Sequence, residues 1–240
     1  MIVVFDGRGF ADQIVSGLPK KKLKLVTIVD PANEAGMKYT KLKEKMAARL
    51  GVEFEIQMTN DKHQIKSKIQ NLNRDPHVDG IMIQVPFPGA DELIKLIDPK
   101  KDVDGLREDS LFKPAVVRAV LEILNNESGI MNNARILVVG SKGFVGRRLI
   151  KELGCEGIDK EDFPSSLKLR RASVIISCTG QANLIDGSMV KNGFTAIDVG
   201  YPKPEFTPDA LAKAGFYTPV PGGVGPVTVA CLFANLAEGV

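Results

Sequence analysis

Short apolar runs alternate with longer amphipathic segments along the first half of the chain. The run LVTIV at residues 25–29 is continuous and rich in β-branched side chains, which predicts a buried strand. Residues 34–50 carry apolar side chains at helical spacing, and Gly51 follows as a C-cap. The same patterns predict further strands at 52–58 and 79–88 and further helices at 62–72, 91–97 and 114–124.

A second series of strands and helices follows a polar spacer at residues 125–134. It contains predicted strands at 135–140, 155–158, 173–178 and 195–200, and predicted helices at 144–153 and 227–237. Strands that alternate with helices indicate right-handed βαβ crossovers and parallel sheets. The sequence therefore predicts an α/β fold of two α/β domains, the second Rossmann-like. The expected domains are 1–113, with the C-terminal helix 227–240 packing back on it, and 114–226.

Composition and charge exclude several classes of protein. The chain of 240 residues is 44% hydrophobic and 25% charged, as is ordinary for a globular protein. No apolar run reaches the roughly 18 residues of a membrane span, and the net charge of +3 gives no argument for nucleic acid. Three scattered cysteines and two histidines argue against a disulfide framework and a zinc site. We expect a cytoplasmic protein.

Three glycines follow the strand at 135–140, at the turn into the next helix. Gly140, Gly143 and Gly146 could let the backbone approach a pyrophosphate, which the free N–H groups of the helix N-terminus would bind. Their spacing is G-x-x-G-x-x-G rather than G-x-G-x-x-G, and a turn without a ligand is the alternative. After the second strand come Asp159, Lys160, Glu161 and Asp162. An acid there would suit the ribose of NAD and a lysine the extra phosphate of NADP, so the sequence leaves both cofactors open.

A second set of candidate residues lies in the N-terminal half. Tyr39 and Lys43 are spaced i, i+4 and share a face of one predicted helix. Gln84 ends a buried strand, where open α/β sheets place groups that bind ligands. Asp102 and Asp104 stand in a turn before Gly105. Each feature also has a structural interpretation, as a surface pair, a loop cap and a turn aspartate.

Taken together, these segments resemble the methylenetetrahydrofolate dehydrogenase/cyclohydrolase family. The resemblance rests on a series of motifs in one order, from about Pro31 to the end of the chain: YTKLK, DGIMIQVPFP, DPKKDVDGL, VVGSKGFVG, ASVIISCTGQANLI, AIDVG and YTPVPGGVGPVTVA. The last motif is the most specific, because it combines glycines that permit close backbone approach with prolines that stiffen the loop.

The resemblance implies a two-step reaction on tetrahydrofolate derivatives, with the active-site cleft between the two domains. Hydride leaves the methylene bridge of the folate for the nicotinamide, and water then adds to the methenyl cation to give the formyl product. It assigns Lys43 to proton handling, Tyr39 to packing against the folate, Gln84 to holding the lysine and Asp104 to binding the pterin. A lysine beside a cation should be desolvated, with a lowered pKa, so that it can act as a base.

The resemblance also assigns residues that contact the two small molecules. Those expected to touch the substrate are Tyr39, Gln84, Val85, Pro86, Asp104, Pro221, Gly222 and Gly223. Those expected to touch the cofactor are Gly140, Ser141, Lys142, Val145, Gly146, Thr179, Gly180, Tyr201, Gly225 and Thr228. The expected cofactor is NADP, with NAD as the alternative. A homodimer is expected, with no metal and no nucleic-acid or membrane partner.

The chain departs from the family pattern at several positions. Gly36 stands where the family has a serine, and Cys-Thr-Pro is missing beside Pro114. The family sequence Gly-Arg-Ser is here Gly140-Ser141-Lys142, so the arginine that meets the NADP phosphate is absent. Alternative functions are a dehydrogenase without cyclohydrolase activity, a non-catalytic folate- or nucleotide-binding regulator and, more distantly, a shikimate-type dehydrogenase.

Overall fold

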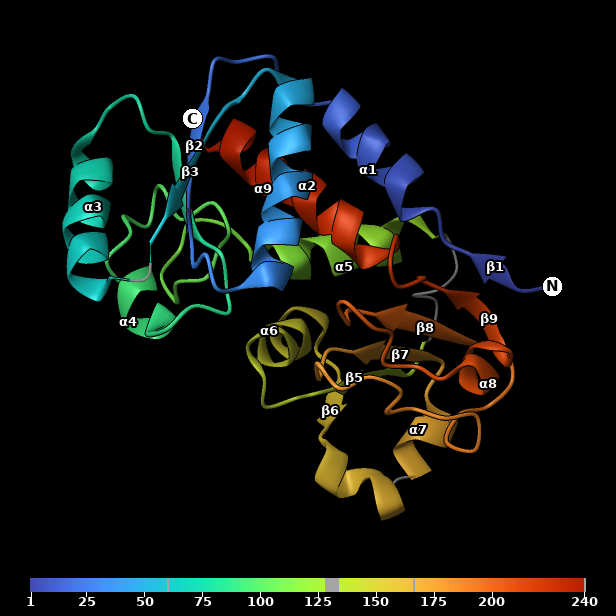
Figure 1. The fold of residues 1–240 in the computed structure, drawn as a ribbon. Helices are drawn as coiled ribbons and strands as arrows, with labels where there is room; N and C mark the ends of the chain where they lie inside the picture. Colours follow the sequence, from blue (N-terminus) through green and yellow to red (C-terminus); the bar gives the residue numbers. More distant parts are fainter. Residues whose placement is uncertain (60, 128–133, 166, 240) are drawn as a thin grey trace. The chain divides into compact units, whose positions relative to one another are not determined.

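The chain divides into two compact units (Figure 1). The computed structural model describes residues 1–59, 61–127, 134–165 and 167–239, so residues 128–133 of the predicted spacer lie outside the described residues. The first unit comprises Asp12–Ala115 and Val229–Val240, and the second unit comprises Met1–Ala11 and Val116–Thr228. Helices α1 (Gly7–Ser16) and α9 (Val224–Glu238) each contain residues of both units.

The first unit contains a parallel sheet of three strands in the order β3-β2-β4. The strands are β2 (Lys24–Val29), β3 (Glu53–Met58) and β4 (Gly80–Ile83). Helix α2 (Glu34–Leu50) packs against β2 and β3. Helices α3 (Lys62–Arg74) and α4 (Ala90–Ile94) complete this α/β layer. A core that includes Val26, Ile28, Ile81 and Ile83 fills one face of the sheet, as the period of two along the strands requires.

Helix α2 carries the candidate lysine, and both of its ends are capped, although only the C-cap at Gly51 was predicted from the sequence. At its start, the side-chain oxygen of Asn33 accepts a hydrogen bond from the backbone N–H of Gly36 at 2.9 Å. At its end, Gly51 adopts a left-handed conformation with φ of 70°. The helix therefore spans the predicted residues 34–50, which fixes the spacing of Tyr39 and Lys43 on one face.

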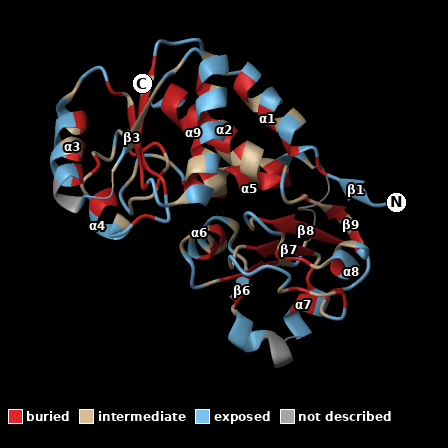
Figure 2. Ribbon diagram, viewed as in Figure 1, coloured by how far each residue is buried: buried red, intermediate tan, exposed pale blue. Residues whose placement is uncertain are grey.

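The second unit contains a parallel sheet of six strands in the order β1-β9-β8-β7-β5-β6. These strands are β1 (Val3–Val4), β5 (Ile136–Val139), β6 (Glu156–Ile158), β7 (Val174–Ser177), β8 (Phe194–Asp198) and β9 (Ala214–Tyr217). The helices are α5 (Ala115–Asn126), α6 (Phe144–Leu153), η1 (Lys160–Ser165), α7 (Leu167–Arg171) and α8 (Pro208–Leu211). The parallel, Rossmann-like α/β class expected from the sequence is confirmed. Strands β7 and β8 are buried (Figure 2).

Several elements with residues in the second unit were not predicted, namely strands β1 and β9 and helices α1, η1, α7 and α8. Strand β1 has only two residues, and it pairs in parallel with β9, more than 200 positions later in the sequence. Strand β9 includes a glycine, which lowers its strand propensity. Helix α1 begins with the sequence GRG, which offers no helix signal. Because β1 pairs with β9, residues 1–11 belong to the second unit.

Candidate functional site

The amine of Lys43 is the centre of the candidate site in the first unit. The side chain of this lysine is only 3% exposed. Its Nζ atom donates a hydrogen bond to Oε1 of Gln84 at 2.9 Å and lies 3.5 Å from the sulfur of Met82. An amine with one strong acceptor and a thioether beside it is held in place, yet its charge is poorly solvated.

Strand β4 determines how Gln84 faces the lysine. The backbone N–H of Gln84 donates to the carbonyl of Ile28 at 2.9 Å, which continues the strand pairing beyond Ile83. Its side-chain amide nitrogen donates to the carbonyl of Val85 at 3.0 Å. With the nitrogen engaged there, the amide oxygen is directed at Lys43. Met82 and Gln84 are two residues apart, so they share the face of β4 toward the amine.

Tyr39 lies one helical turn before Lys43. The amine of Lys43 is 5.1 Å from the centroid of the Tyr39 ring, within the range of a cation–π contact. The i, i+4 spacing therefore produces a real contact, and not only a shared face. The ring is partly exposed, so a ligand beside it can reach its surface.

Burial and one nearby carboxylate control the charge of the lysine. Burial lowers the pKa of Lys43 to about 8, and the charge of Asp104 acts in the opposite direction. Burial raises the pKa of Asp104, and the charge of Lys43 partly offsets this effect. The two groups therefore influence each other's charge, and the neutral amine becomes available near neutral pH.

Asp102 and Asp104 have different roles in the turn before Gly105. Asp102 is buried and accepts a hydrogen bond from the backbone N–H of Arg107 at 2.8 Å, so it organises the turn. Burial raises the pKa of Asp102 to about 6. Asp104 is only half-buried and interacts with Lys43 through its charge. Of the two, Asp104 is the one available to a ligand.

Gly36 stands where the family has a serine, and its surroundings leave no room for a side chain. A Cβ atom at residue 36 would lie 2.5 Å from the side-chain nitrogen of Asn33. That nitrogen donates to the carbonyl of Pro86 at 2.9 Å, in the loop that follows Gln84. Asn33 thus links the start of α2 to this loop and occupies the space that a serine at position 36 would need. The sequence analysis did not single out Asn33.

The glycine loop of the second unit has the form that a pyrophosphate site requires. Gly140 has a positive φ of 96°, and Gly143 is the N-cap of α6. A Cβ atom at Gly146 would lie 2.1 Å from the carbonyl oxygen of Gly140, so only glycine permits this close approach of helix and loop. The loop and the free N–H groups of the first turn of α6 therefore fit a dinucleotide pyrophosphate.

A buried carboxylate that the sequence analysis missed organises the loop after β7. Glu205 is 1% exposed and accepts hydrogen bonds from the backbone N–H of Thr179 at 2.9 Å and of Gly180 at 2.7 Å. It also accepts from the hydroxyls of Thr179 and Ser177. Thr179 and Gly180 are predicted cofactor contacts, so Glu205 shapes that part of the site. The motif KPEF offered no periodic signal for this role.

The thiol of Cys178, next to this loop, is not activated. Its sulfur donates to the carbonyl of Val139 at 3.3 Å, and burial raises its pKa to about 12. A thiol in this state is a poor nucleophile.

The remaining predicted contacts lie on several elements. Pro221, Gly222 and Gly223 form the turn at the start of α9 in the second unit, with Gly222 at φ of 111°. The other residues expected at the cofactor are in the first turn of α6, after β8 and in the first turns of α9, namely Val145, Tyr201, Gly225 and Thr228. The roles of these residues stay predictions.

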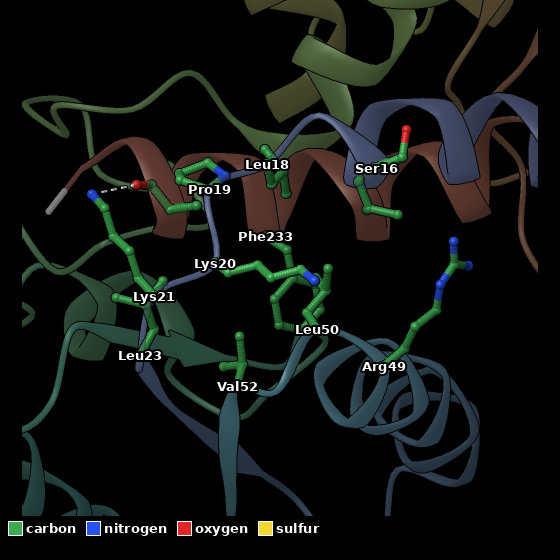
Figure 3. Close-up of a pocket in the computed structure, with 12 residues that line it drawn as sticks. Ser16, Leu18, Pro19, Lys20, Lys21, Leu23, Arg49, Leu50, Val52 and Phe233 are labelled. Carbon is green, nitrogen blue, oxygen red and sulfur yellow. Dashed lines mark hydrogen bonds between the residues drawn. The ribbon is translucent and has the colours of Figure 1, made fainter.

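A separate cavity of about 210 Å³ lies at the opposite end of the first unit's sheet from Gln84 (Figure 3). Leu23 and Val52, which precede β2 and β3, line it together with Phe233. Because the strands are parallel, these residues mark the amino ends, whereas Gln84 follows a carboxyl end. Lys21 at its rim donates to the carbonyl of Ala237 at 3.2 Å. The cavity is therefore distinct from the Lys43 site.

None of the described helices is long and apolar enough to cross a membrane. No group of three or more His, Cys, Asp or Glu in the described ranges is placed to hold a metal ion.

Comparison with known protein families gives two matches that together span most of the chain. Residues 8–104 match the catalytic domain of the tetrahydrofolate dehydrogenase/cyclohydrolase family. Residues 114–240 match the NAD(P)-binding domain of the same family.

Individual relatives match over nearly their whole length. The bifunctional protein FolD of Xanthomonas euvesicatoria pv. vesicatoria is 33% identical over 276 residues, covering 98% of this chain and 91% of that protein. A 5,10-methylenetetrahydrofolate dehydrogenase from the silkworm Bombyx mori is 28% identical with a TM-score of 0.88, covering 100% of this chain and 98% of that one. The Trypanosoma brucei dehydrogenase-cyclohydrolase, solved with NADP and an inhibitor, is 25% identical with a TM-score of 0.87. The match covers 99% of this chain and 97% of that one.

Proposed function

The chain belongs to the tetrahydrofolate dehydrogenase/cyclohydrolase family, and from this premise we propose that it performs both reactions with Lys43 as the group that moves protons. Methylenetetrahydrofolate is oxidised to methenyltetrahydrofolate, which is then hydrolysed to 10-formyltetrahydrofolate. The observation that carries the proposal is the hydrogen bond of 2.9 Å between the buried amine of Lys43 and Gln84. This arrangement makes a base whose pKa is near the working pH.

Lys43 acts in the hydrolytic step. Its neutral form takes a proton from the water molecule that adds to the methenyl carbon. Its lowered pKa also means that the positive charge of the methenyl group meets a smaller repulsion than a fully protonated lysine would exert. When the folate ring opens, the protonated amine can return a proton to the departing nitrogen.

Gln84, Tyr39 and Asp104 position the lysine and the substrate. Gln84 holds the amine at a fixed direction through its side-chain oxygen. The ring of Tyr39 forms a surface beside the amine against which a flat pterin can pack. The carboxylate of Asp104 can accept paired N–H groups from the pterin, an arrangement that gives strong and directional hydrogen bonds.

The second unit holds the dinucleotide. Gly140, Gly146 and the N-terminus of α6 bind the pyrophosphate, and the Glu205-supported loop of Thr179 and Gly180 lies at the carboxyl end of the adjacent strand β7. Bound NAD(P) supplies the acceptor for the hydride that leaves the methylene carbon.

We further propose a cytoplasmic homodimer, with tetrahydrofolate derivatives as its substrates. The three cysteines are free thiols, which suits a reducing compartment. Sedimentation equilibrium of the purified protein would measure the oligomeric state.

The test of the function follows both products separately. Purified protein is mixed with methylenetetrahydrofolate and NAD or NADP, and the absorbance of the reduced nicotinamide and of the methenyl product is recorded. We expect reduction of the nicotinamide without accumulation of the methenyl form. Accumulation of that form would indicate a dehydrogenase alone. Absence of turnover with both cofactors would contradict the proposal.

A further inference from the structure

The end of strand β6 lies beside the glycine loop of the second unit. Strand β6 pairs with β5, and α6 connects the two, so together they form the first βαβ unit of the Rossmann-like sheet. Asp159 follows β6 directly. In such folds, the residue at the carboxyl end of the second strand faces the 2′ position of the adenosine ribose.

The glycine loop holds the carboxylate of Asp159 in place. The backbone N–H groups of Gly140 and Ser141 donate to the carbonyl of Ile158 at 2.9 and 3.2 Å, which brings the loop beside the end of β6. The hydroxyl of Ser141 donates to Oδ2 of Asp159, and the backbone N–H of Lys142 donates to Oδ1 at 3.5 Å. The carboxylate of Asp159 therefore lies directly beside the glycine loop.

Further negative charge lies beside Asp159. The carboxylate of Asp162 accepts a hydrogen bond from the backbone N–H of Asp159 at 3.0 Å. Glu161 lies between them on η1. Three acidic residues thus follow β6 within four positions, with Lys160 among them.

Two nearby cations, Lys142 and Arg148, are engaged with other groups. Ser141 stands where the family has its arginine, and its hydroxyl is engaged with Asp159. Lys142 is 78% exposed, and its Nζ atom lies 3.6 Å from a carboxylate oxygen of Glu161. The guanidinium of Arg148 lies 3.6 Å from the centroid of the Phe144 ring, which it covers.

We infer that Asp159 makes NAD the dinucleotide that this enzyme binds more tightly, and that it weakens the binding of NADP. A ribose 2′-hydroxyl can donate a hydrogen bond to the carboxylate, as hydroxyl groups do to ionised acceptors. A 2′-phosphate would instead bring roughly two negative charges against that carboxylate. The inference rests on the proposed dehydrogenase function and specifies the cofactor of the same site.

Calorimetric titration of the whole protein with NAD and with NADP, at one salt concentration and without folate, tests this inference. We expect a Kd for NAD at least about tenfold lower than that for NADP. Asp159→Asn removes the charge and should reduce this ratio, and Ser141→Arg should strengthen NADP binding. Glu152→Gln, which removes an exposed charge on α6, is the control and should change the ratio less than Asp159→Asn.

The outcomes separate the inference from the function on which it rests. Tighter binding of NADP than of NAD by the native protein would overturn the inference and leave the proposed function intact. An unchanged ratio in a folded Asp159→Asn variant would also overturn it. Binding of neither dinucleotide would overturn the proposed function together with the inference. Thermal unfolding of each variant shows whether it is folded. The ratio of the two Kd values in the native protein decides which dinucleotide is preferred, and it does not depend on how any variant folds.

Discussion

The amine of Lys43 and the side-chain oxygen of Gln84 lie 2.9 Å apart, although the two residues are separated by 41 positions in the sequence. Helix α2 supplies the amine and the end of β4 supplies the oxygen. The amine is buried against a single strong acceptor and a thioether, so its charged form is less stable than in water. This relationship gives the first unit a base that works near neutral pH.

Replacement of Lys43 by methionine should abolish most of the hydrolytic activity. Lys43→Met keeps an unbranched apolar side chain and removes the amine, so proton transfer would be lost, at a cost of about 10²- to 10⁴-fold in rate. Lys45→Met, which changes an exposed lysine on the same helix, is the control and should keep full activity. The measurement is the rate of methenyltetrahydrofolate hydrolysis. A Lys43→Met enzyme with native rates would show that another group moves the proton.

The rate of hydrolysis should rise with pH and level off above about 8, because the neutral amine of Lys43 is the active form. Asp104 raises the pKa of Lys43 through its charge, so Asp104→Asn should lower that pKa and move the midpoint of the profile to lower pH. Asp91→Asn, an exposed change in the same unit, should leave the midpoint in place. A midpoint that moves upward in Asp104→Asn would contradict this electrostatic account.

Glu205→Gln should weaken dinucleotide binding. The carboxylate accepts hydrogen bonds from four donors. A glutamine amide has only one oxygen, so its NH₂ group would face one of these donors and that hydrogen bond would be lost. A buried group left without its partner costs about 1–3 kcal/mol, so we expect a higher Kd for the dinucleotide and a lower unfolding temperature. Glu205→Asp, which keeps the charge, should restore part of the affinity. Native affinity in Glu205→Gln would exclude a role for this carboxylate in the loop.

Two buried threonines in the first unit should respond differently to the same substitution. Both are fully buried, but the hydroxyl of Thr40 donates to the carbonyl of Gly36 at 2.9 Å, whereas that of Thr27 has no partner among the described residues. We expect Thr40→Val to lower the free energy of unfolding by about 1 kcal/mol. Thr27→Val should leave it unchanged or raise it. Urea unfolding of the two variants provides the comparison, and a larger loss in Thr27→Val would reveal an unrecognised partner, such as a buried water.

The local pattern of apolar and polar residues was sufficient to predict many of the helices and strands. Helix α2 has the bounds that its apolar spacing and Gly51 predict, and α6 spans the predicted residues 144–153. These features depend on interactions within a few residues, which a sequence displays directly. Strand β1 was missed because two residues form no pattern, and only pairing with the distant β9 makes them a strand.

The sequence by itself determined that Tyr39 and Lys43 share a helical face, that glycines follow the strand β5 and that Gln84 ends a buried strand. Only the tertiary structure decided that Gln84 accepts from the amine, that burial and Asp104 set its pKa, and that Glu205 and Asp159 engage their loops. The physical reason is that helical and strand periods are properties of neighbouring residues. Contact, burial and electrostatic coupling depend instead on how segments far apart in the chain are packed together.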